Sequence, residues 1–340
     1  MAKLYHDNGY VNMDYVSNQK EPFISVIGGR GTGKTYGALQ DLLERSDCFI
    51  FLRRTQTQAD ILSKKEFQPF NALSNSDLTT NKLNKYVTGF YHTDDDGAPV
   101  GEPVGYLCAL STFASIRGID FSKVTKIIYD EFIPETHERP IKNEAQALWN
   151  VYETVNRNRE LQGKAAVKLI MLSNSNTINN PIFISLGITD SIAKMQSKGV
   201  EVMRFNKKNL VIFDLQYSKI SEKKKGTVLY QLTQADESFS DMALSNKFAD
   251  VPDNVSSADL KQYILKYQLD NMYIYKHKSE MLFYVTNIRS GTPLEIYTNT
   301  SLDITAFKMS HKEILMSYYG RSLFFTNVSC ALKFKNILNL

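Results

Sequence analysis

The sequence has few of the features that mark secreted or membrane proteins. No stretch of its 340 residues approaches the run of about 20 apolar residues that a bilayer-crossing helix needs, and the first residues lack the apolar segment of a signal peptide. Its three cysteines, Cys48, Cys108 and Cys330, are widely spaced, and two of them lie in apolar, strand-like runs. That pattern favours buried free thiols in a reducing compartment over a disulfide or a metal site. We therefore expect a cytoplasmic protein without a membrane partner.

A strong net charge is also missing. The chain carries a formal charge of +4, which is too small to indicate a nucleic-acid partner by itself. The segment from Glu201 to Lys225 nevertheless holds seven basic residues and three acidic ones, an excess equal to that of the whole chain. A track for a polyanion and a solvated loop explain this basic segment equally well.

What the sequence does contain is a complete phosphate-binding loop. Residues 28–35 read Gly-Gly-Arg-Gly-Thr-Gly-Lys-Thr, which fits the pattern G-x-x-x-x-G-K-[ST]. The β-branched apolar run Phe23–Ile27 precedes the loop, and the residues after Thr35 suit a helix. Strand, loop and helix therefore follow in the order that the motif needs. We conclude that the chain binds a nucleoside triphosphate.

The positions of the loop have distinct predicted roles. Backbone N–H groups wrap the phosphates at the helix N-terminus, where unpaired donors and the helix dipole favour anions. Lys34 reaches the β- and γ-phosphate oxygens, and Thr35 places its hydroxyl on Mg²⁺. For Arg30, contact with the γ-phosphate, contact with a catalytic carboxylate and exposure to solvent all stay open. The predicted nucleotide-binding residues of the loop are Gly28, Gly29, Arg30, Gly31, Thr32, Gly33, Lys34 and Thr35.

Two carboxylates end a later strand. The apolar run Ile127-Ile128-Tyr129 leads directly into Asp130 and Glu131. In ATPases with a phosphate loop an aspartate at this point organises Mg²⁺, so we assign Asp130 to the metal together with Thr35. Glu131 is the candidate general base, because a carboxylate one hydrogen bond away from water can accept its proton. The pair also predicts the ASCE type of sheet, in which the strand that bears the metal carboxylate does not directly neighbour the loop strand.

Further polar residues are candidates for the reaction. Ser173 and Asn174 close the apolar run 168–172, and we favour Asn174 as a contact to the γ-phosphate or its water over a simple turn residue. Arg157 and Arg159 are candidates for stabilising charge during phosphoryl transfer. Since residues two apart do not share a helix face, only one of them points at a given phosphate if the helix continues. Surface ion pairs account for both arginines equally well. The base of the nucleotide stays unassigned, since Tyr10, Tyr15 and Gln19 suit either base contacts or a packed N-terminal arm.

The organisation of the chain predicts two domains. Apolar residues make up 43% and charged residues 22% of the sequence, which is typical of a soluble globular protein of sufficient length for two domains. Apolar strands that alternate with helices after the loop imply an α/β domain with a mostly parallel sheet. A hairpin is expected around residues 94–97. We predict a P-loop ATPase domain over 1–195, a basic linker or lid over 196–235, and a smaller α+β domain over 236–340.

Together these motifs resemble those of the DNA-encapsidation and large-terminase ATPases of tailed bacteriophages, and most of all the packaging ATPases of phi-29-type podophages. The likeness covers roughly residues 20–185. It is carried by residues 28–35, 129–133 (Tyr-Asp-Glu-Phe-Ile), 154–160 and 172–181, in the same order. The resemblance implies ATP-driven translocation of viral double-stranded DNA into a preformed capsid, with ATP and Mg²⁺ as cofactors. It also makes Arg157 the better candidate for a finger inserted into the neighbouring subunit's site.

The resemblance also implies partners and a role for the second domain. The expected partners are double-stranded DNA, further copies of this chain in a homomeric ring expected to be a pentamer, and the portal of a prohead, with a structural RNA left open. The second domain is expected to be a degenerate, ribonuclease-H-like fold. Its β candidates 272–276 and 281–286 contain no Asp or Glu, so we expect it to bind DNA or the portal rather than cleave DNA. Candidate phosphate contacts there are Lys261, Lys266, Lys276, Lys278 and Arg289. The expected location is the host cytoplasm and, during assembly, the portal vertex.

Other functions are compatible with the same motifs. One is a helicase- or recombinase-like ATPase that acts on nucleic acid. Another is a non-catalytic assembly protein that the nucleotide only stabilises. A small-molecule kinase fits less well, because it does not explain an Asp-Glu pair followed by two arginines.

Overall fold

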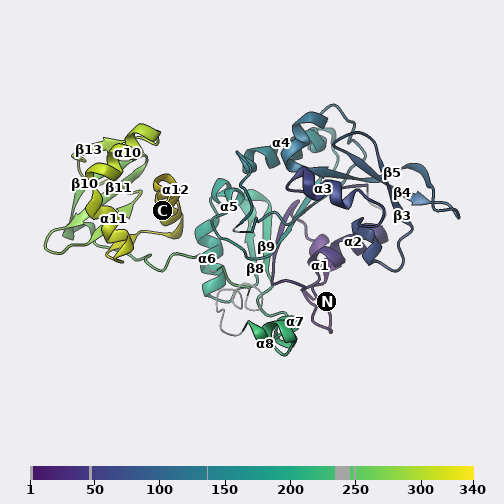
Figure 1. Cartoon of the computed structure of the whole chain (residues 1–340), viewed down its shortest axis with the longest axis horizontal. Coiled ribbons are helices and arrows are strands. Elements are labelled where there is room, and N and C mark those ends of the chain that lie inside the picture. The colour runs from purple at the N-terminus through teal and green to yellow at the C-terminus, as the bar shows by residue number, and fades with distance from the viewer. Residues whose placement is uncertain (1–2, 46–47, 136, 234–245, 249) are drawn as a thin grey trace. The chain divides into compact units, whose positions relative to one another are not determined.

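The computed structural model describes residues 3–45, 48–135, 137–233, 246–248 and 250–340 (Figure 1). The chain divides into two compact units. The first consists of Met1–Ile182 and Met195–Ala249, and the second of Phe183–Lys194 and Asp250–Leu340. None of the helices among the described residues has the length and apolar character that a membrane crossing requires.

The first unit is built on a nine-stranded sheet with the strand order β3-β4-β5-β2-β6-β7-β1-β9-β8. Neighbouring strands from β5 to β9 run parallel, and antiparallel strands lie at both edges. The parallel strands are β1 (Phe23–Ile27), β2 (Phe49–Arg53), β5 (Pro99–Ala109), β6 (Lys126–Asp130), β7 (Lys168–Ser173) and β9 (Leu210–Asp214). The antiparallel ones are β3 (Leu78–Lys82), β4 (Thr88–Thr93) and β8 (Val202–Phe205).

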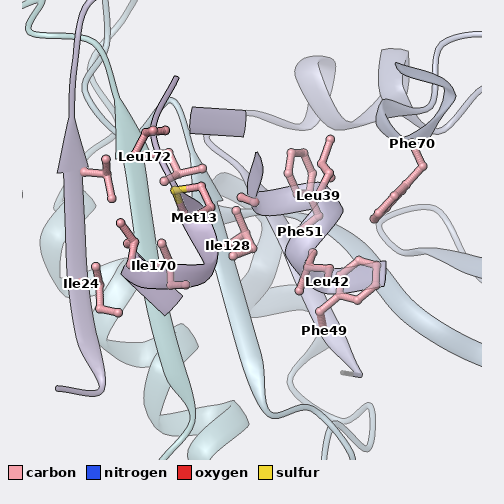
Figure 2. Close-up of a cluster of buried hydrophobic side chains, with 14 of the residues drawn as sticks. Met13, Ile24, Leu39, Leu42, Phe49, Phe51, Phe70, Ile128, Ile170 and Leu172 are labelled. Atoms are coloured by element: carbon pink, nitrogen blue, oxygen red, sulfur yellow. The ribbon is translucent and has the colours of Figure 1, made fainter. Parts of the chain in front are cut away.

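The central strands are buried along their length because both faces of the sheet are covered. All residues of β6 and of β9 are buried, as are the last four of β1, which is the pattern expected of a parallel sheet inside an α/β domain. On one face, Ile24, Ile128 and Ile170 of three strands share a buried apolar cluster with Leu39 and Leu42 of helix α2 (Lys34–Arg45) and Met13 of α1 (Met13–Ser17) (Figure 2).

The remaining helices of the first unit connect or flank these strands. They are α3 (Gln56–Leu62), α4 (Glu144–Asn156), α7 (Lys219–Lys224) and α8 (Val228–Leu232). Helices α5 (Pro181–Leu186) and α6 (Thr189–Ser197) are divided between the units. The segment Phe183–Lys194, which covers most of both helices, belongs to the second unit. Short 3-10 helices occur at Pro69–Ala72, Leu110–Ile116, Arg159–Gln162, Asn206–Lys208 and Leu260–Gln262.

The strand order places the predicted motifs at one edge of the sheet. Strand β7 lies between the loop strand β1 and the carboxylate strand β6, which confirms the predicted ASCE arrangement. Because the three strands are parallel, the residues that follow them, Gly28, Glu131 and Asn174, all lie at the carboxyl edge. The predicted hairpin is confirmed as well, since β4 and β5 pair antiparallel on either side of residues 94–97.

The structure corrects the predicted domain limits. Residues 196–235 are not a linker throughout, because 202–214 form β8 and β9 of the large sheet, and β9 pairs directly with the loop strand β1. The reason is the apolar run Leu210–Phe213, which the basic residues around it obscure in the sequence. The two units divide at 249/250 rather than near 235, and residues 183–194 join the second unit.

The second unit contains a five-stranded sheet with the order β13-β10-β11-β12-β14. The strands are β10 (Tyr263–Leu269), β11 (Met272–His277), β12 (Phe283–Thr286), β13 (Glu295–Tyr297) and β14 (Leu323–Phe325), and the helices are α10 (Ser301–Ser310), α11 (Lys312–Tyr319) and α12 (Val328–Leu338). Strands β10 to β12 are antiparallel, whereas β13 and β14 pair parallel at the two edges. Its own apolar core joins sheet and helices through residues such as Ile274, Phe307 and Phe334.

Candidate nucleotide-binding site

The phosphate loop forms a tight turn between β1 and α2. The Gly28 N–H donates to the Ser173 carbonyl of β7 (3.1 Å), and the Thr32 hydroxyl donates to the Gly29 carbonyl (3.0 Å). Gly31 and Gly33 adopt φ angles of +70° and +90°, which glycine accepts without a steric penalty. Helix α2 begins at Lys34, so its N-terminal N–H groups border the loop and create a site that favours anions.

Lys34 lies at the floor of this site. Its side chain is buried, and Nζ donates to the carbonyls of Gly28 (2.8 Å) and Gly29 (2.9 Å) and to Oδ1 of Asn174 (3.1 Å). Burial lowers the pKa of Lys34 to about 7, and the charge of Asp130 only partly opposes this. Phosphate oxygens beside Nζ would favour the ammonium form, since a nearby anion stabilises it.

Thr35 and Asp130 form an oxygen pair suited to Mg²⁺. The Thr35 hydroxyl donates to Asp130 Oδ1 at 2.9 Å, and adjacent ligands of octahedral Mg²⁺ at about 2.1 Å lie roughly 3 Å apart. Asp130 is buried, which raises the pKa of its carboxyl, while the Arg53 guanidinium opposes that rise. No group of three or more His, Cys, Asp or Glu side chains suited to a metal occurs among the described residues. A magnesium ion here would therefore need phosphate or water ligands as well.

Arg53 is a site residue that the sequence analysis did not identify. At the end of β2, its Nη1 donates to Asp130 Oδ2 (2.6 Å) and its Nη2 pairs with Glu131. The only signal in the sequence is an apolar strand ending in Arg53-Arg54. That signal becomes informative once β2 is known to lie beside β6, with Leu52 opposite Tyr129.

Glu131 stands at the rim of the site. It follows Asp130 directly and has a left-handed backbone (φ 56°), a conformation that non-glycine residues adopt rarely. Its carboxylate is 54% exposed and pairs with Arg53. The side chain that we predict as general base is therefore accessible to water and, through Arg53, linked to Asp130.

One cavity of about 350 Å³ unites most of the predicted site. Its lining includes residues Arg30 to Thr35 together with Asp130, Glu131 and Asn174. Asn174 accepts a hydrogen bond from Lys34 Nζ and lines the cavity, and its contact to the γ-phosphate stays a prediction. Arg30 pairs with Glu135, a second carboxylate of the same cavity, so it contacts a site carboxylate rather than only solvent.

Arg157 and Arg159 lie outside this cavity. Helix α4 ends at Asn156, and Arg157 caps it with a φ of 43°. The Arg157 guanidinium donates to the Ile119 carbonyl (3.1 Å) and lies 3.4 Å from Asp120. Arg159 donates to backbone carbonyls, including that of Ala165 (3.0 Å). Because the helix does not continue through both residues, the argument from helix faces does not apply to them.

A second cavity of about 890 Å³ adjoins the loop. It shares Gly31, Gly33 and Tyr36 with the first cavity and is also lined by Tyr10 and Gln40. Of the three residues considered for the nucleotide base, only Tyr10 lies at this cavity. Tyr15 packs edge-on against Phe213, and Gln19 forms hydrogen bonds with the Tyr15 carbonyl and with Arg204. Both therefore belong to a packed N-terminal arm, by which we mean the described residues before β1 (3–22).

Comparison with known proteins identifies the family of this chain. The DNA packaging protein of Bacillus phage B103 is 27% identical over 323 residues, which is 92% of each chain, and that of Bacillus phage phi29 is 24% identical over 329 residues, covering 92% of this chain and 89% of the relative. A solved structure of the Phi-29 viral genome packaging motor assembly matches 99% of this chain and 100% of its own with a TM-score of 0.65 and 18% identity. The Phi-28 gp11 DNA packaging motor matches 98% of this chain and 99% of its own with a TM-score of 0.61 and 21% identity. Residues 6–339 match the profile of the Podovirus DNA encapsidation protein (Gp16) family, and the chain therefore belongs to that family of DNA packaging proteins.

Proposed function

We propose that this DNA packaging ATPase hydrolyses ATP at the phosphate loop with Glu131 as general base. The observation that carries the proposal is the convergence of Lys34, Thr35, Asp130, Glu131 and Asn174 on one cavity. Hydrolysis of a phosphoanhydride needs positioning and charge neutralisation more than covalent help. Lys34 and the loop N–H groups hold the phosphates, and Thr35 and Asp130 hold Mg²⁺, which supplies charge neutralisation when bound. Glu131 accepts a proton from water.

The nucleoside is proposed to occupy the larger cavity next to the loop. Tyr10 and Tyr36, 43% and 50% exposed, line that cavity together with Gln40. Aromatic rings there provide surfaces for stacking on a base, and the Gln40 amide offers both a donor and an acceptor. This assignment gives the N-terminal arm a part in nucleotide binding.

Arg157 is proposed as a finger that acts on the neighbouring subunit. It lies at the end of α4, away from the cavity of its own chain, and its side chain is 46% exposed. The matching solved structure of the Phi-29 viral genome packaging motor assembly supports a multi-subunit arrangement, which we propose to be a homomeric ring, expected to be a pentamer. In this arrangement the arginine stabilises transition-state charge in trans.

The ring is proposed to drive double-stranded DNA through the portal of a prohead in the host cytoplasm, with or without a structural RNA between them. Contacts to DNA would be mainly to phosphates, independent of sequence and sensitive to salt. The proposed contacts in the second unit are the exposed Lys261, Lys278 and Arg289 and the half-buried Lys266 and Lys276. This unit is proposed to be ribonuclease-H-like and to lack nuclease activity.

The test is ATP turnover with and without double-stranded DNA and empty capsids. Lys34→Ala should abolish ATP binding, whereas Glu131→Gln should bind ATP but lose turnover by about 100-fold or more, in line with the loss of a general base. Glu153→Gln, on an exposed position of α4, is the matched control and should stay active. Normal hydrolysis by Glu131→Gln would refute the base assignment. ATP binding without turnover, even with DNA and capsids, would instead support the non-catalytic assembly role.

The trans role of Arg157 has a separate test. Arg157→Ala protein mixed with Glu131→Gln protein should recover part of the turnover, because some interfaces then combine an intact base with an intact arginine. A mixture that assembles normally and stays inactive would contradict the proposal.

A further inference from the structure

The segment that follows β9 packs on the phosphate loop. A Cβ placed on Gly28 would lie 2.8 Å from Leu215 Cδ1, and the Leu215 N–H donates to the Ile27 carbonyl (2.8 Å). Further along, the Ser218 hydroxyl donates to the Gly9 carbonyl of the N-terminal arm (2.9 Å). Residues 215–224, which we call the closing segment, therefore contact both the loop and the arm that lines the second cavity.

Lys224 ends helix α7 and turns toward the loop. Its Nζ donates to the Arg30 carbonyl, and a Cβ on Gly31 would lie 2.8 Å from that Nζ. The flanking lysines behave differently: Lys223 and Lys225 are exposed, whereas Lys224 is half-buried. Three consecutive lysines, which the sequence presents as one basic run, thus separate into one that contacts the loop and two that face solvent.

Among the described residues around the loop, Lys224 has no acidic partner. Arg30 is paired with Glu135, and Asp130 lies close enough to favour the charged form of Lys34. Among the described residues Lys224 forms no ion pair, and both burial and the charge of Arg30 lower its pKa. An ammonium group has three N–H donors, and the Arg30 carbonyl accepts one of them. The Lys224 Nζ also lies 5.9 Å from the centroid of the Tyr230 ring. A phosphate shared with Arg30 and Lys34 would stabilise all three cations more directly, because a nearby anion favours the charged form.

Lys224 lies against Arg30 and Gly31, which line the cavity, but is not itself part of that lining. From this geometry we infer that Lys224 is a phosphate-binding residue of the ATP site, supplied by the closing segment, that reaches the phosphates of the bound nucleotide past Arg30 and Gly31. The inference rests on the proposed binding of ATP at the loop and extends it. The phosphate chain would then be held from the loop by Lys34 and from outside the P-loop motif by Lys224. Nucleotide binding would also fix the closing segment against the N-terminal arm.

The experiment measures ATP and ADP affinity of the full-length protein by calorimetry with Mg²⁺. Lys224→Met keeps the apolar stem and removes the charge, Lys224→Arg keeps the charge, and Lys223→Met and Lys225→Met are matched controls. Loss of one charge-assisted hydrogen bond predicts about tenfold weaker ATP binding for Lys224→Met. The two controls and Lys224→Arg should stay within about threefold of the unmodified protein, a change of less than about 0.7 kcal/mol. Added salt should reduce the difference in ATP affinity between Lys224→Met and the unmodified protein, because salt screens the charge.

Two results would overturn the inference. One is ATP and ADP binding by Lys224→Met as tight as in the unmodified protein, including the case in which only DNA binding falls. The other is an equal loss in all three methionine variants, which would reflect general charge rather than a contact. Circular dichroism verifies the fold of each variant, and Lys224→Gln replaces the methionine variant if that one is unfolded. Lys34→Ala in the same titration tests the site itself, because undiminished ATP binding there refutes the proposed function independently of Lys224.

Discussion

At the scale of single residues, the site depends on Arg53, which pairs with two carboxylates, Asp130 and Glu131. Asp130 is almost completely buried, and its charged form is stabilised by Arg53 and by the Thr35 hydroxyl. Arg53 itself is only 12% exposed, and its Nε has no hydrogen-bond partner among the described residues. Such a side chain is held by its two carboxylate contacts, so a change at Arg53 affects Asp130 and Glu131, the proposed metal ligand and the proposed general base, together.

Replacement of Arg53 is therefore expected to reduce both stability and turnover. Arg53→Met leaves the carboxyl of Asp130 buried without its ion-pair partner, and breaking a buried pair in this way costs about 3–5 kcal/mol. Urea unfolding measures the loss. Arg53→Lys keeps the charge but loses the two-pronged geometry of the guanidinium. Its unfolding free energy should lie between those of Arg53→Met and the unmodified protein. A methionine variant as stable as the unmodified protein would contradict the structural role of the pair.

Asp214 gives a prediction for pH. It ends β9, is fully buried, and accepts hydrogen bonds from Gln216 (2.8 Å) and Asn246. Burial raises its pKa to about 7, above the ordinary value of about 4. The folded protein then binds a proton that the unfolded chain releases, so this group makes stability fall as the pH rises from about 4 to about 7. Asp214→Asn should remove this contribution to the fall in unfolding free energy. Relative to the unmodified protein, the variant should therefore gain more stability at pH 8 than at pH 5.

Denaturant unfolding of both proteins at pH 5 and pH 8 provides the measurement. Asn is nearly isosteric with Asp, and its side-chain oxygen still accepts from Asn246, so packing is retained. Equal stability differences between the two proteins at both pH values would show that Asp214 stays ionised in the folded protein.

At the scale of elements, helix α4 links the carboxylate strand to the proposed finger. Near its N-terminus, Glu144 accepts two hydrogen bonds from the fully buried Arg54 (2.8 and 3.1 Å) and one from the Tyr129 hydroxyl (3.0 Å). Tyr129 and Arg54 are the chain neighbours of Asp130 and Arg53. The other end of the helix carries Arg157. A buried contact therefore joins β6 and the end of β2 to the start of α4.

This buried cluster predicts a large effect from a single change. Glu144→Ala removes the buried partner of Arg54 and leaves it only the partly exposed Glu138, so we expect a loss of about 3 kcal/mol in unfolding free energy, at the low end for a broken buried pair. The double variant Arg54→Met, Glu144→Leu replaces the pair with apolar side chains of similar size and should recover a large part of that loss. A double variant no more stable than Glu144→Ala, measured by urea unfolding, would show that the position of the helix and not the Arg54 charge determines the effect.

Elements with a local signal were predictable, whereas those that depend on neighbours were not. The strands before the loop and before Asp130 have continuous apolar runs, and the structure confirms both as β1 and β6. The five residues of β9 carry the same signal, yet the basic residues on either side led to a linker assignment. The role of Arg53 depends on β2 being next to β6, and the position of Lys224 depends on the path of the closing segment. Neither relation is present in the local sequence.

At the scale of the whole molecule, the two units differ in what each contributes. The first contains the complete cavity around the loop, so nucleotide binding is proposed to be its property. The second has a separate sheet and a separate core, and contacts to DNA or the portal are proposed to belong to it. The division at 249/250 leaves β8, β9 and the closing segment with the ATPase unit.

That division predicts how fragments behave. A fragment of residues 1–195 lacks β9 and β8, and β1 would become an edge strand with buried, apolar residues along its length. Exposed apolar edges of this kind promote aggregation, so this fragment should elute as aggregate and melt without a cooperative transition. A fragment of residues 1–248 retains the nine strands and the closing segment, and it should be monodisperse and bind ATP. If the shorter fragment instead unfolded cooperatively and bound ATP as well as the longer one, β9 would be dispensable and the sequence-based limit at 195 would be the better domain boundary.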